Sequence, residues 1–434
     1  MLRPLLLKSE VARFWCRNGH WTPAGLAAAL GDATILVKRS SAARHFMYTA
    51  QGRTDILADT DASTEGVQIA AADFFAALDQ PPPPYLYFTS PIETLGEAAG
   101  GRLQGGAPGW EMLSSEHMPA GGARPWLQLW AGTAGACTQA HYDVADNLFV
   151  QCSGTKEFLL YPPSAAKALH VFPDSHPRAR KAQVCLEQPD YSRHPRARQL
   201  PAPSRVVLEP GDALFVPAFH IHHVTAASAS ISLNVFSESA IKLAASVPLS
   251  LPPPLHAAWP SELKRLGLET LLSSLLLSLG MPPLPQFATE LLDSRFAPLA
   301  EDRTSPADAT ATDGNRPPVI RRRRRPPVAP AWEDLEPSLH AHAGEYAEAF
   351  AQLRRAVLDA SQPHRRPWRN HACTVVEVTT PNTVDARALA DAHYAAIREL
   401  TIAHLVELLT VRLFGPASIQ AELELLAGRI PTSA

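Results

Sequence analysis

The chain has 434 residues, of which 46% are hydrophobic, and a formal net charge of -3 at pH 7. This length exceeds what one compact domain usually needs, so we expect a principal domain with at least one appendage. The hydrophobic content is sufficient for a core. The small net charge excludes a global attraction to nucleic acid or membranes, so any basic partner surface must be local.

The cysteines are scattered, and no two of them form a C-x-x-C pair. They are Cys16, Cys137, Cys152, Cys185 and Cys373. This pattern argues against a disulfide framework and against a structural zinc site, and it favours a reducing compartment. The apolar run at the start is too short for a signal peptide, so we expect a cytoplasmic or nuclear protein. The segment Leu271 to Gly280 is only about half a membrane span, so we expect a buried or partner-facing helix and no membrane partner.

The pattern of the first half of the chain predicts an N-terminal α/β region followed by a β-rich core. Over residues 1–95 we expect a helix after Thr22, the strand ATILVKR and an extended aromatic segment after a proline tract. Residues 125–240 contain short strands separated by Gly and Pro turns, which is typical of a barrel or jelly roll. The clearest strands are HYDVADNLFVQC, KEFLLYPP, RVVLEPGDALFVP and SISLNVF, with a polar insertion at about 174–204 after the second.

The pattern becomes helical after about residue 250. Leu263 to Leu279 has helical periodicity, and residues 332–360 and 383–428 also read as helices. Residues 302–331 are rich in Pro, Asp, Thr and Arg and include the run Arg321 to Arg325. We interpret this stretch as a disordered basic linker. An RNA-binding arm or a nuclear-localisation signal is the alternative for the arginine run.

The strongest chemical motif is His141-Tyr142-Asp143. In a strand, residues two apart point to the same face, so His141 and Asp143 can chelate one metal ion. A third ligand would complete a facial triad that leaves positions open for other ligands. The candidates follow the strand LFVP: they are His220, His222 and His223. Either motif alone occurs often without a metal, but together on a barrel they favour a metal site.

These segments resemble the JmjC-type cupin oxygenases. The similarity runs through LQLW (127–130), Thr138, HYDVADNL (141–148), the turn at 154–156, LLYPP (159–163), LEPGDALFVPAFHIHHV (208–224) and SLNVF (232–236). Within this family the motif HYDVADNL is most similar to the tRNA wybutosine-synthesizing hydroxylases. The resemblance covers about residues 3–240, and nothing comparable is recognised in the remaining residues.

The resemblance implies an α+β fold with a double-stranded β-helix, which binds Fe(II) and uses 2-oxoglutarate and dioxygen. It implies that the distal ligand lies five residues after Pro217, which selects His222 and completes a triad with His141 and Asp143. The chain departs from the family pattern at His220, where many relatives carry an aromatic residue. By strand parity His220 shares a face with His222, either behind this ligand or competing with it, whereas His223 points the other way.

The resemblance also implies a binding site for 2-oxoglutarate. Lys156 matches the basic residue that pairs with the far carboxylate of this co-substrate, and a dianion in an apolar barrel needs a buried cation. The alternative for Lys156 is an exposed hairpin position. Tyr87 matches a tyrosine that reaches the co-substrate carboxylate, although Tyr85 competes for this assignment. Further polar positions that line the pocket are Thr138, Asn147 and Asn234.

The resemblance implies a hydroxylase that acts on a hypermodified guanine of the wybutosine pathway, with tRNA as the partner. Basic residues of the insertion suit phosphate contacts while an extruded base reaches the metal; they are Arg178, Arg180, Lys181, Arg193, Arg196 and Arg198. A solvated loop is an equal alternative. Two other functions stay open: a JmjC protein hydroxylase or histone demethylase, and a non-catalytic metal-binding cupin that serves as a scaffold.

We therefore divide the chain into four parts. Residues 1–245 are the JmjC or cupin domain, with its barrel core at about 125–240. A helical extension (246–300), the basic linker (301–331) and a C-terminal helical region (332–434) follow. The wide apolar faces of the C-terminal helices predict packing on the barrel or a homodimer. We expect His364 and His371 to be surface or core residues rather than ligands.

Overall fold

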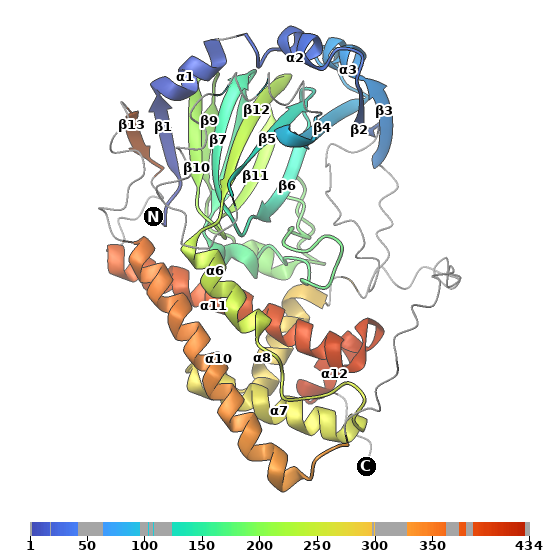
Figure 1. Cartoon of the computed structure of the whole chain (residues 1–434), viewed down its shortest axis with the longest axis vertical. Helices are drawn as coiled ribbons and strands as arrows, with labels where there is room; N and C mark the ends of the chain where they lie inside the picture. Colours follow the sequence, from blue (N-terminus) through green and yellow to red (C-terminus); the bar gives the residue numbers. More distant parts are fainter. Residues whose placement is uncertain are drawn as a thin grey trace.

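A computed structural model of the chain describes residues 2–17, 19–41, 64–95, 103, 107, 124–296, 299, 328–361, 373–378 and 385–429. A barrel of two antiparallel sheets lies above a group of helices (Figure 1). This arrangement confirms the predicted α+β fold with a jelly-roll barrel and a C-terminal helical region. The arginine run, His364 and His371 lie outside the described residues.

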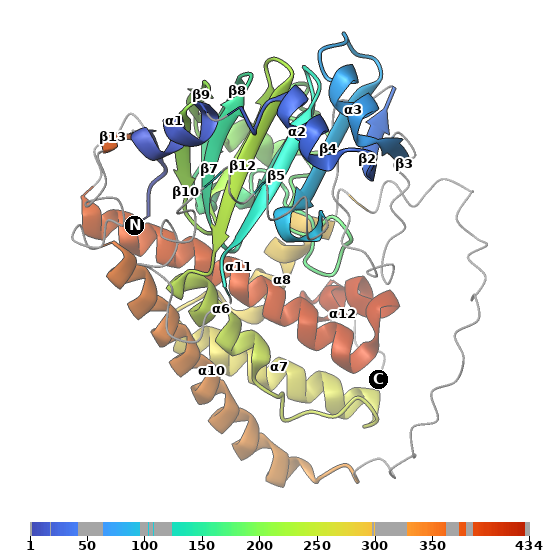
Figure 2. The same cartoon turned by 45° about the horizontal axis from the view of Figure 1, so that its top comes forward.

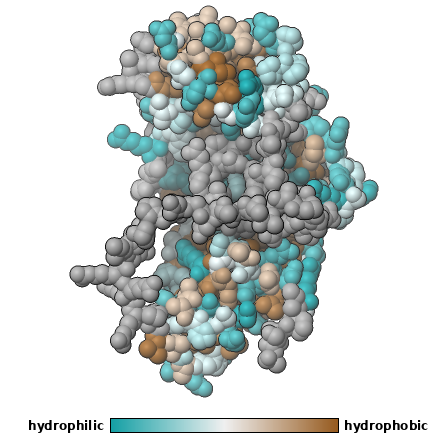
Figure 3. Space-filling model, turned by 90° about the vertical axis from the view of Figure 1, so that its right-hand side faces the viewer, coloured by the Kyte–Doolittle hydropathy of each residue, from teal (hydrophilic) through white to brown (hydrophobic). Residues whose placement is uncertain are grey.

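The larger sheet has the strand order β13-β1-β10-β7-β12-β5-β4-β2-β3 among the described residues. In chain order its strands are β1 (Leu5–Ser9), β2 (Thr34–Ser40), β3 (Thr64–Ala70), β4 (Tyr85–Pro91), β5 (Trp126–Gly132), β7 (Asp146–Ser153), β10 (Asp212–Val216), β12 (Ser230–Ser237) and β13 (Cys373–Glu377). Figure 3 looks onto the side of β2 and β3, and apolar side chains gather in the upper part of that face. Leu36 on β2 is 55% exposed.

The smaller sheet has the order β6-β11-β8-β9 and closes the barrel. Its strands are β6 (Cys137–Tyr142), β8 (Lys156–Tyr161), β9 (Ser204–Leu208) and β11 (Ile221–Ala226). β11 lies in the middle and pairs with β6 on one side and with β8 on the other. This sheet therefore holds the two histidine-bearing segments of the predicted metal site side by side.

Alternate residues of the strands face two different apolar cores. On β7, Leu148 and Val150 pack in the core beneath the N-terminal helices α1 (Glu10–Arg17), α2 (Pro23–Leu30) and α3 (Ala71–Ala77). Phe149, between them, faces the barrel interior, where its ring centroid lies 4.9 Å from that of Phe158 on β8. This period of two assigns every second residue to the interior.

The turn between β7 and β8 depends on a glycine. Gly154 has a φ of +68°, and a Cβ atom there would lie 1.8 Å from the carbonyl oxygen of Ala229. Only glycine fits this left-handed and crowded position. The turn fixes the place where β8 begins, and hence the position of Lys156, its first residue.

Helices from the second half of the chain form the lower layer. They are α6 (Ala240–Ser250), α7 (Ser261–Ser278), α8 (Leu284–Leu291), α10 (Trp332–Ala360), α11 (Ala386–Phe414) and α12 (Ile419–Leu426). Figure 2 shows α11 running directly beneath the barrel. These helices confirm the helical periodicity predicted for Leu263 to Leu279 and the helix predicted over residues 332–360. Whether the apolar faces also form a homodimer stays a prediction.

Part of the insertion after β8 packs against the barrel and the helices. Ala182, Val184 and Ala197 are buried in the same core as Leu405 of α11. The insertion also runs alongside β6, where the amide of Ala182 donates to the carbonyl of Ala140 at 2.7 Å. The insertion therefore forms the junction between barrel and helices, and of its basic residues Lys181 is buried whereas Arg180 and Arg198 are exposed, as the solvated-loop alternative expects.

A buried ionic cluster fastens this junction. The guanidinium of Arg295, which follows α8, lies 2.9 Å from Asp174 of the insertion and 2.9 Å from Glu407 of α11. The second carboxylate oxygen of Glu407 accepts from the amide of Ser175 at 3.2 Å. All three charged side chains are buried, so the opposite charges compensate one another in place of water.

Among the described helices, none is by itself long and apolar enough to cross a membrane. The bent pair Ala386–Phe414 and Pro416–Leu426 meets the same requirement of length and composition only when its members are taken together.

Candidate metal centre

Three predicted ligands converge at one end of the barrel. The pairing of β6 with β11 sets His141 directly opposite His222, and their ring centroids are 4.2 Å apart. Asp143 follows β6 immediately, and its Oδ2 atom lies 3.7 Å from Nε2 of His222. One ligand atom from each residue lies within 4.8 Å of the others. The three side chains are thus close enough to share one metal ion.

Backbone carbonyls orient both imidazoles. Nδ1 of His141 lies 2.8 Å from the carbonyl oxygen of Gln139, and Nδ1 of His222 lies 3.2 Å from that of His220. If each Nδ1–H donates to its carbonyl, each Nε2 keeps a free lone pair for the metal. This is the tautomer that a histidine ligand needs.

The protonation states also suit a cation. Burial lowers the pKa of His141 to about 3, so its ring is neutral at physiological pH. Burial by itself would raise the pKa of Asp143, but His141, His222 and the cations Arg180 and Lys181 hold it below its ordinary value. Two neutral imidazoles and one carboxylate on one face form the donor set of a non-haem Fe(II) centre.

Lys156 lies inside the barrel, 4% exposed, and not at an exposed hairpin position. Its ammonium donates to Oγ of Ser232 at 2.7 Å and lies 5.0 Å from the ring centroid of Phe149, and both residues belong to the larger sheet. Among the described residues no carboxylate lies within ion-pair distance of it. Burial lowers its pKa to about 7. A buried amine without a counter-charge is suited to an anionic ligand.

The remaining predicted pocket residues contact one another in pairs. The hydroxyls of Tyr87 and Thr138 are 3.2 Å apart, and the amide of Asn234 donates to Oδ1 of Asn147 at 3.0 Å. Tyr87 is buried whereas Tyr85 is half-buried, which favours Tyr87 for the pocket. Oδ1 of Asn234 is buried and has no hydrogen-bond partner in the described part of the chain. These polar atoms fit a carboxylate-bearing co-substrate, and their individual roles remain predictions.

Sequence reasoning missed two neighbours of this pocket. Ser232 accepts from Lys156, and Trp130 pairs with Ser232 across β5 and β12. Nε1 of Trp130 is buried and lacks a hydrogen-bond partner in the described part of the chain. Strand parity could have found Ser232, because it lies two residues before Asn234 on the same strand.

His220 corrects one prediction. It does not share the face of His222, because Phe219 has a φ of +67° and β11 begins only at Ile221. The reversed backbone turns the ring of His220 toward α11, where its centroid lies 5.1 Å from that of His393. His220 orients His222 through its carbonyl, and the prediction of a competing ligand is wrong. The prediction for His223 is confirmed, since its ring lies on the outer face of the sheet near Glu187.

The basic residues of the insertion separate into different environments. Arg196 forms a two-pronged ion pair with Glu290 of α8, so its charge is neutralised within the chain. Lys181 is buried, and its backbone forms an isolated antiparallel β-bridge with His141. Arg180 and Arg198 are exposed. The predicted six-residue cluster is thus not a single phosphate-binding surface.

A cavity of about 380 Å³ lies between the insertion, α6 and α11, and none of the three metal ligands lines it. The insertion, α6 and α11 form its walls together with the two neighbours of Asp143. Residues that line it include Tyr142, Val144, Arg180, Lys181, Lys242 and His404. The lining has mixed charge: Arg180 is a cation, Lys242 forms an ion pair with Glu238, burial lowers the pKa of Lys181 to about 7, and Asp174 contributes a carboxylate.

Residues 97–242 match the family described as the cupin-like domain. The chain is 36% identical over 116 residues to the tRNA wybutosine-synthesizing protein 5 of Danio rerio and 33% identical over 116 residues to that of Homo sapiens. It is 32% identical over 114 residues to the lysine-specific demethylase JMJ31 of Arabidopsis thaliana. Each match covers 26% of this chain and 30%, 31% and 21% of the respective relative, so the chain spans less than a third of the curated relatives it matches.

The two antiparallel sheets and the match over residues 97–242 identify a cupin-like domain of the JmjC type. Its similar proteins carry two kinds of name, tRNA wybutosine-synthesizing protein and lysine-specific demethylase.

Proposed function

We propose that this chain is an Fe(II)- and 2-oxoglutarate-dependent hydroxylase. The observation that carries the proposal is the convergence of His141, Asp143 and His222 in a barrel that also buries Lys156, with no counter-charge for it among the described residues. Facial coordination by three residues leaves the other side of the metal open. When bound, iron with 2-oxoglutarate and dioxygen supplies the oxidising chemistry that hydroxylates a C–H bond.

The chain itself contributes positioning, charge and exclusion of water. The carbonyls of Gln139 and His220 hold the two imidazoles in the ligating orientation. Lys156, with the hydroxyl of Ser232 beside it, receives the far carboxylate of 2-oxoglutarate. The interior around them is lined by Phe149 and Phe158, which exclude water and so strengthen this ion pair.

We propose tRNA as the substrate, with a hypermodified guanine of the wybutosine pathway as the hydroxylated group. The similarity to tRNA wybutosine-synthesizing proteins supports this assignment. The exposed cation Arg180, which lines the cavity, also supports it, because it suits a phosphate group that accompanies an extruded base. Such a substrate is consistent with a cytoplasmic or nuclear location.

A protein side chain is the second candidate substrate. The match to a lysine-specific demethylase is similar in extent to the tRNA-related matches and favours it directly. In that case the cavity would receive a peptide, and Arg180 would have no phosphate to bind.

Succinate release separates these candidates. Purified protein would be incubated with Fe(II), ascorbate and 2-oxoglutarate, alone, with tRNA lacking the final wybutosine hydroxyl, or with methyl-lysine peptides. We expect tRNA to stimulate release in the wild type. The variants His141→Ala and Asp143→Ala should show no stimulated turnover, since each lacks a metal ligand. Stimulation by peptides alone would transfer the assignment to the second candidate.

Absence of turnover would also be informative. Well-folded, iron-loaded protein that releases no succinate with either substrate would contradict the hydroxylase proposal. It would favour the non-catalytic scaffold instead. Substantial 2-oxoglutarate consumption by His141→Ala would contradict the proposed ligand set.

A further inference from the structure

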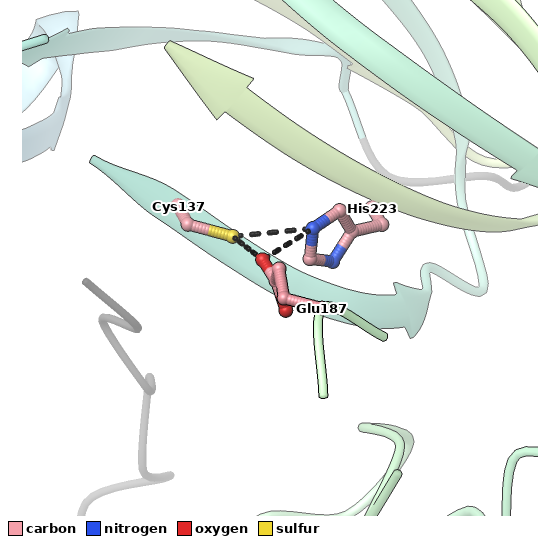
Figure 4. A group of neighbouring side chains, drawn as sticks. All are labelled: Cys137, Glu187 and His223. Carbon is pink, nitrogen blue, oxygen red and sulfur yellow. Dashed lines mark hydrogen bonds and ion pairs between the residues drawn. The ribbon is translucent and has the colours of Figure 1, made fainter. Parts of the chain in front are cut away.

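A second group of metal-type ligands lies on the opposite face of the smaller sheet. Figure 4 shows the side chains of Cys137 from β6, His223 from β11 and Glu187 from the insertion pointing toward one another. Cys137 and His223 are buried, and Glu187 is exposed. Since His223 directly follows His222 on an extended strand, this group is separated from the iron ligands by the thickness of the sheet.

The distances match a coordination sphere. Sγ of Cys137 lies 3.3 Å from Nε2 of His223 and 3.7 Å from Oε1 of Glu187, and Nε2 lies 3.3 Å from Oε1. Tetrahedral zinc binds sulfur at roughly 2.3 Å and nitrogen or oxygen at roughly 2.0–2.2 Å, which places ligand atoms roughly 3.4–3.6 Å apart. The three atoms therefore already form a triangle of the size that zinc requires.

The chemistry of the donors selects the kind of metal. A thiolate combined with an imidazole and a carboxylate suits borderline-soft Zn²⁺, whereas magnesium and calcium prefer oxygen alone. Burial and the nearby Glu187 carboxylate raise the pKa of the Cys137 thiol to about 12. A divalent cation at the centre of the triangle would offset both effects and leave the sulfur deprotonated.

The site is open to solvent on one side and has a second thiol nearby. The Glu187 side chain is 42% exposed, so an ion can enter from that side. Its second oxygen, Oε2, lies 3.4 Å from Sγ of half-buried Cys185. Solvent or Cys185 is thus available for the fourth coordination position.

We propose that Cys137, Glu187 and His223 form a zinc-binding site that is distinct from the iron centre. The bound ion fastens the insertion, through Glu187, to the outer face of β6 and β11. It thereby braces from behind the two strands that carry His141 and His222. This proposal does not depend on the hydroxylase assignment, because the donors and their distances are independent of the reaction inside the barrel.

Cobalt binding to the full chain tests the proposal with a readout that the iron site cannot produce. The iron ligands contain no sulfur, so a sulfur-to-cobalt charge-transfer band in the near ultraviolet reports only a thiolate ligand. We expect Co(II) titration of the metal-free wild type to give two bound ions per chain and this band, and added Zn²⁺ to abolish the band. The double variant His141→Ala/Asp143→Ala should lose one ion and keep the band.

Variants of the proposed ligands complete the test. Cys137→Ala and Glu187→Ala should each lose one bound ion and the band. Glu187 is exposed, so its variant is expected to fold normally, as circular dichroism would verify. Cys16→Ser, which removes a thiol from α1, is the matched control and should bind as the wild type does. A wild type that binds one ion without the band, or a band that persists in both ligand variants, would overturn the proposal.

Discussion

Two of the buried cations in this chain have contrasting surroundings. Arg295, at the junction of insertion and helices, lies 2.9 Å from each of two carboxylates. Lys156, inside the barrel, has a hydroxyl and an aromatic ring beside it. Arg295 finds its counter-charges within the chain, so its role is structural. Lys156 lacks a counter-charge in the described part of the chain, and so it indicates where a ligand must supply one.

Removing Arg295 should produce the largest effect on stability. The variant Arg295→Ala would leave Asp174 and Glu407 buried without their cation, and breaking a buried pair in this way costs about 3–5 kcal/mol. Urea unfolding followed by circular dichroism would measure the loss. Arg354→Ala, at an exposed ion pair with Asp391, is the control and should cost less than about 1 kcal/mol. Equal losses in the free energy of unfolding for the two variants would contradict the distinction between the buried and the exposed ion pair.

Replacing Lys156 should stabilise the ligand-free protein, in contrast to the loss expected for Arg295→Ala, and should weaken the binding of 2-oxoglutarate. Lys156→Met removes a charge that the apo barrel solvates poorly, so the melting temperature of the ligand-free protein should rise. It also removes the charge-assisted contact to 2-oxoglutarate, which should weaken binding roughly 10- to 100-fold. Calorimetry would measure both quantities. An unchanged affinity would contradict the assigned role of Lys156.

The pKa of Lys156 predicts a pH dependence. Burial lowers this pKa from 10.5 to about 7 in the free protein, so the amine loses its charge as the pH rises through 7. Affinity for 2-oxoglutarate should then fall by up to about tenfold per pH unit above that value. Since the folded-state pKa lies below the unfolded one, the ligand-free protein should gain stability relative to Lys156→Met as the pH rises from 7 toward 10.5. Titrations of both proteins over this range would detect either trend, and a flat profile in the wild type would contradict the mechanism.

Glu407 should give the smallest effect. Asp174 and Glu407 share the cation Arg295: His404 and Arg295 lower the pKa of Asp174, while burial raises that of Glu407 to about 7. Because the raised pKa favours the protonated form in the folded state, stability from this group is lost as the pH rises through about 7. Glu407→Gln should therefore differ from the wild type by less than about 1 kcal/mol at acidic pH, and its relative stability should rise with pH. A pH-independent difference would exclude the titration of Glu407 as its cause.

The parts of this protein that follow local periodicity could be predicted from its sequence. The spacing of His141 and Asp143 on a strand is sufficient to place both at one site, and helical periodicity is sufficient to locate α7 and α10. Contacts between distant parts of the chain could not be found in this way. Strand parity places Ser232 on the same face as Asn234, but its hydrogen bond with Lys156 arises only when β8 is folded across from β12.

Two features lie beyond the reach of spacing rules for the same reason. Strand parity failed at His220 because Phe219 adopts a left-handed backbone that no residue pattern signalled. The scattered cysteines carry no zinc-binding pattern, and the zinc site that we propose arises only because the fold brings Cys137 within 3.3 Å of His223 from a distant part of the chain. Spacing rules detect sites formed by neighbouring residues and are insensitive to sites that tertiary structure assembles.

The cavity between the insertion, α6 and α11 has one wall from outside the barrel. Leu400, Thr401 and His404 of α11 line it, whereas His141, His222 and Lys156 lie on barrel strands and Asp143 directly follows β6. If the proposed substrate enters this cavity, chemistry and selectivity are encoded in separate stretches of sequence. Substitutions in α11 would then reshape what the cavity admits without disturbing a ligand, so substrate choice could diverge in this helix while the proposed reaction is retained.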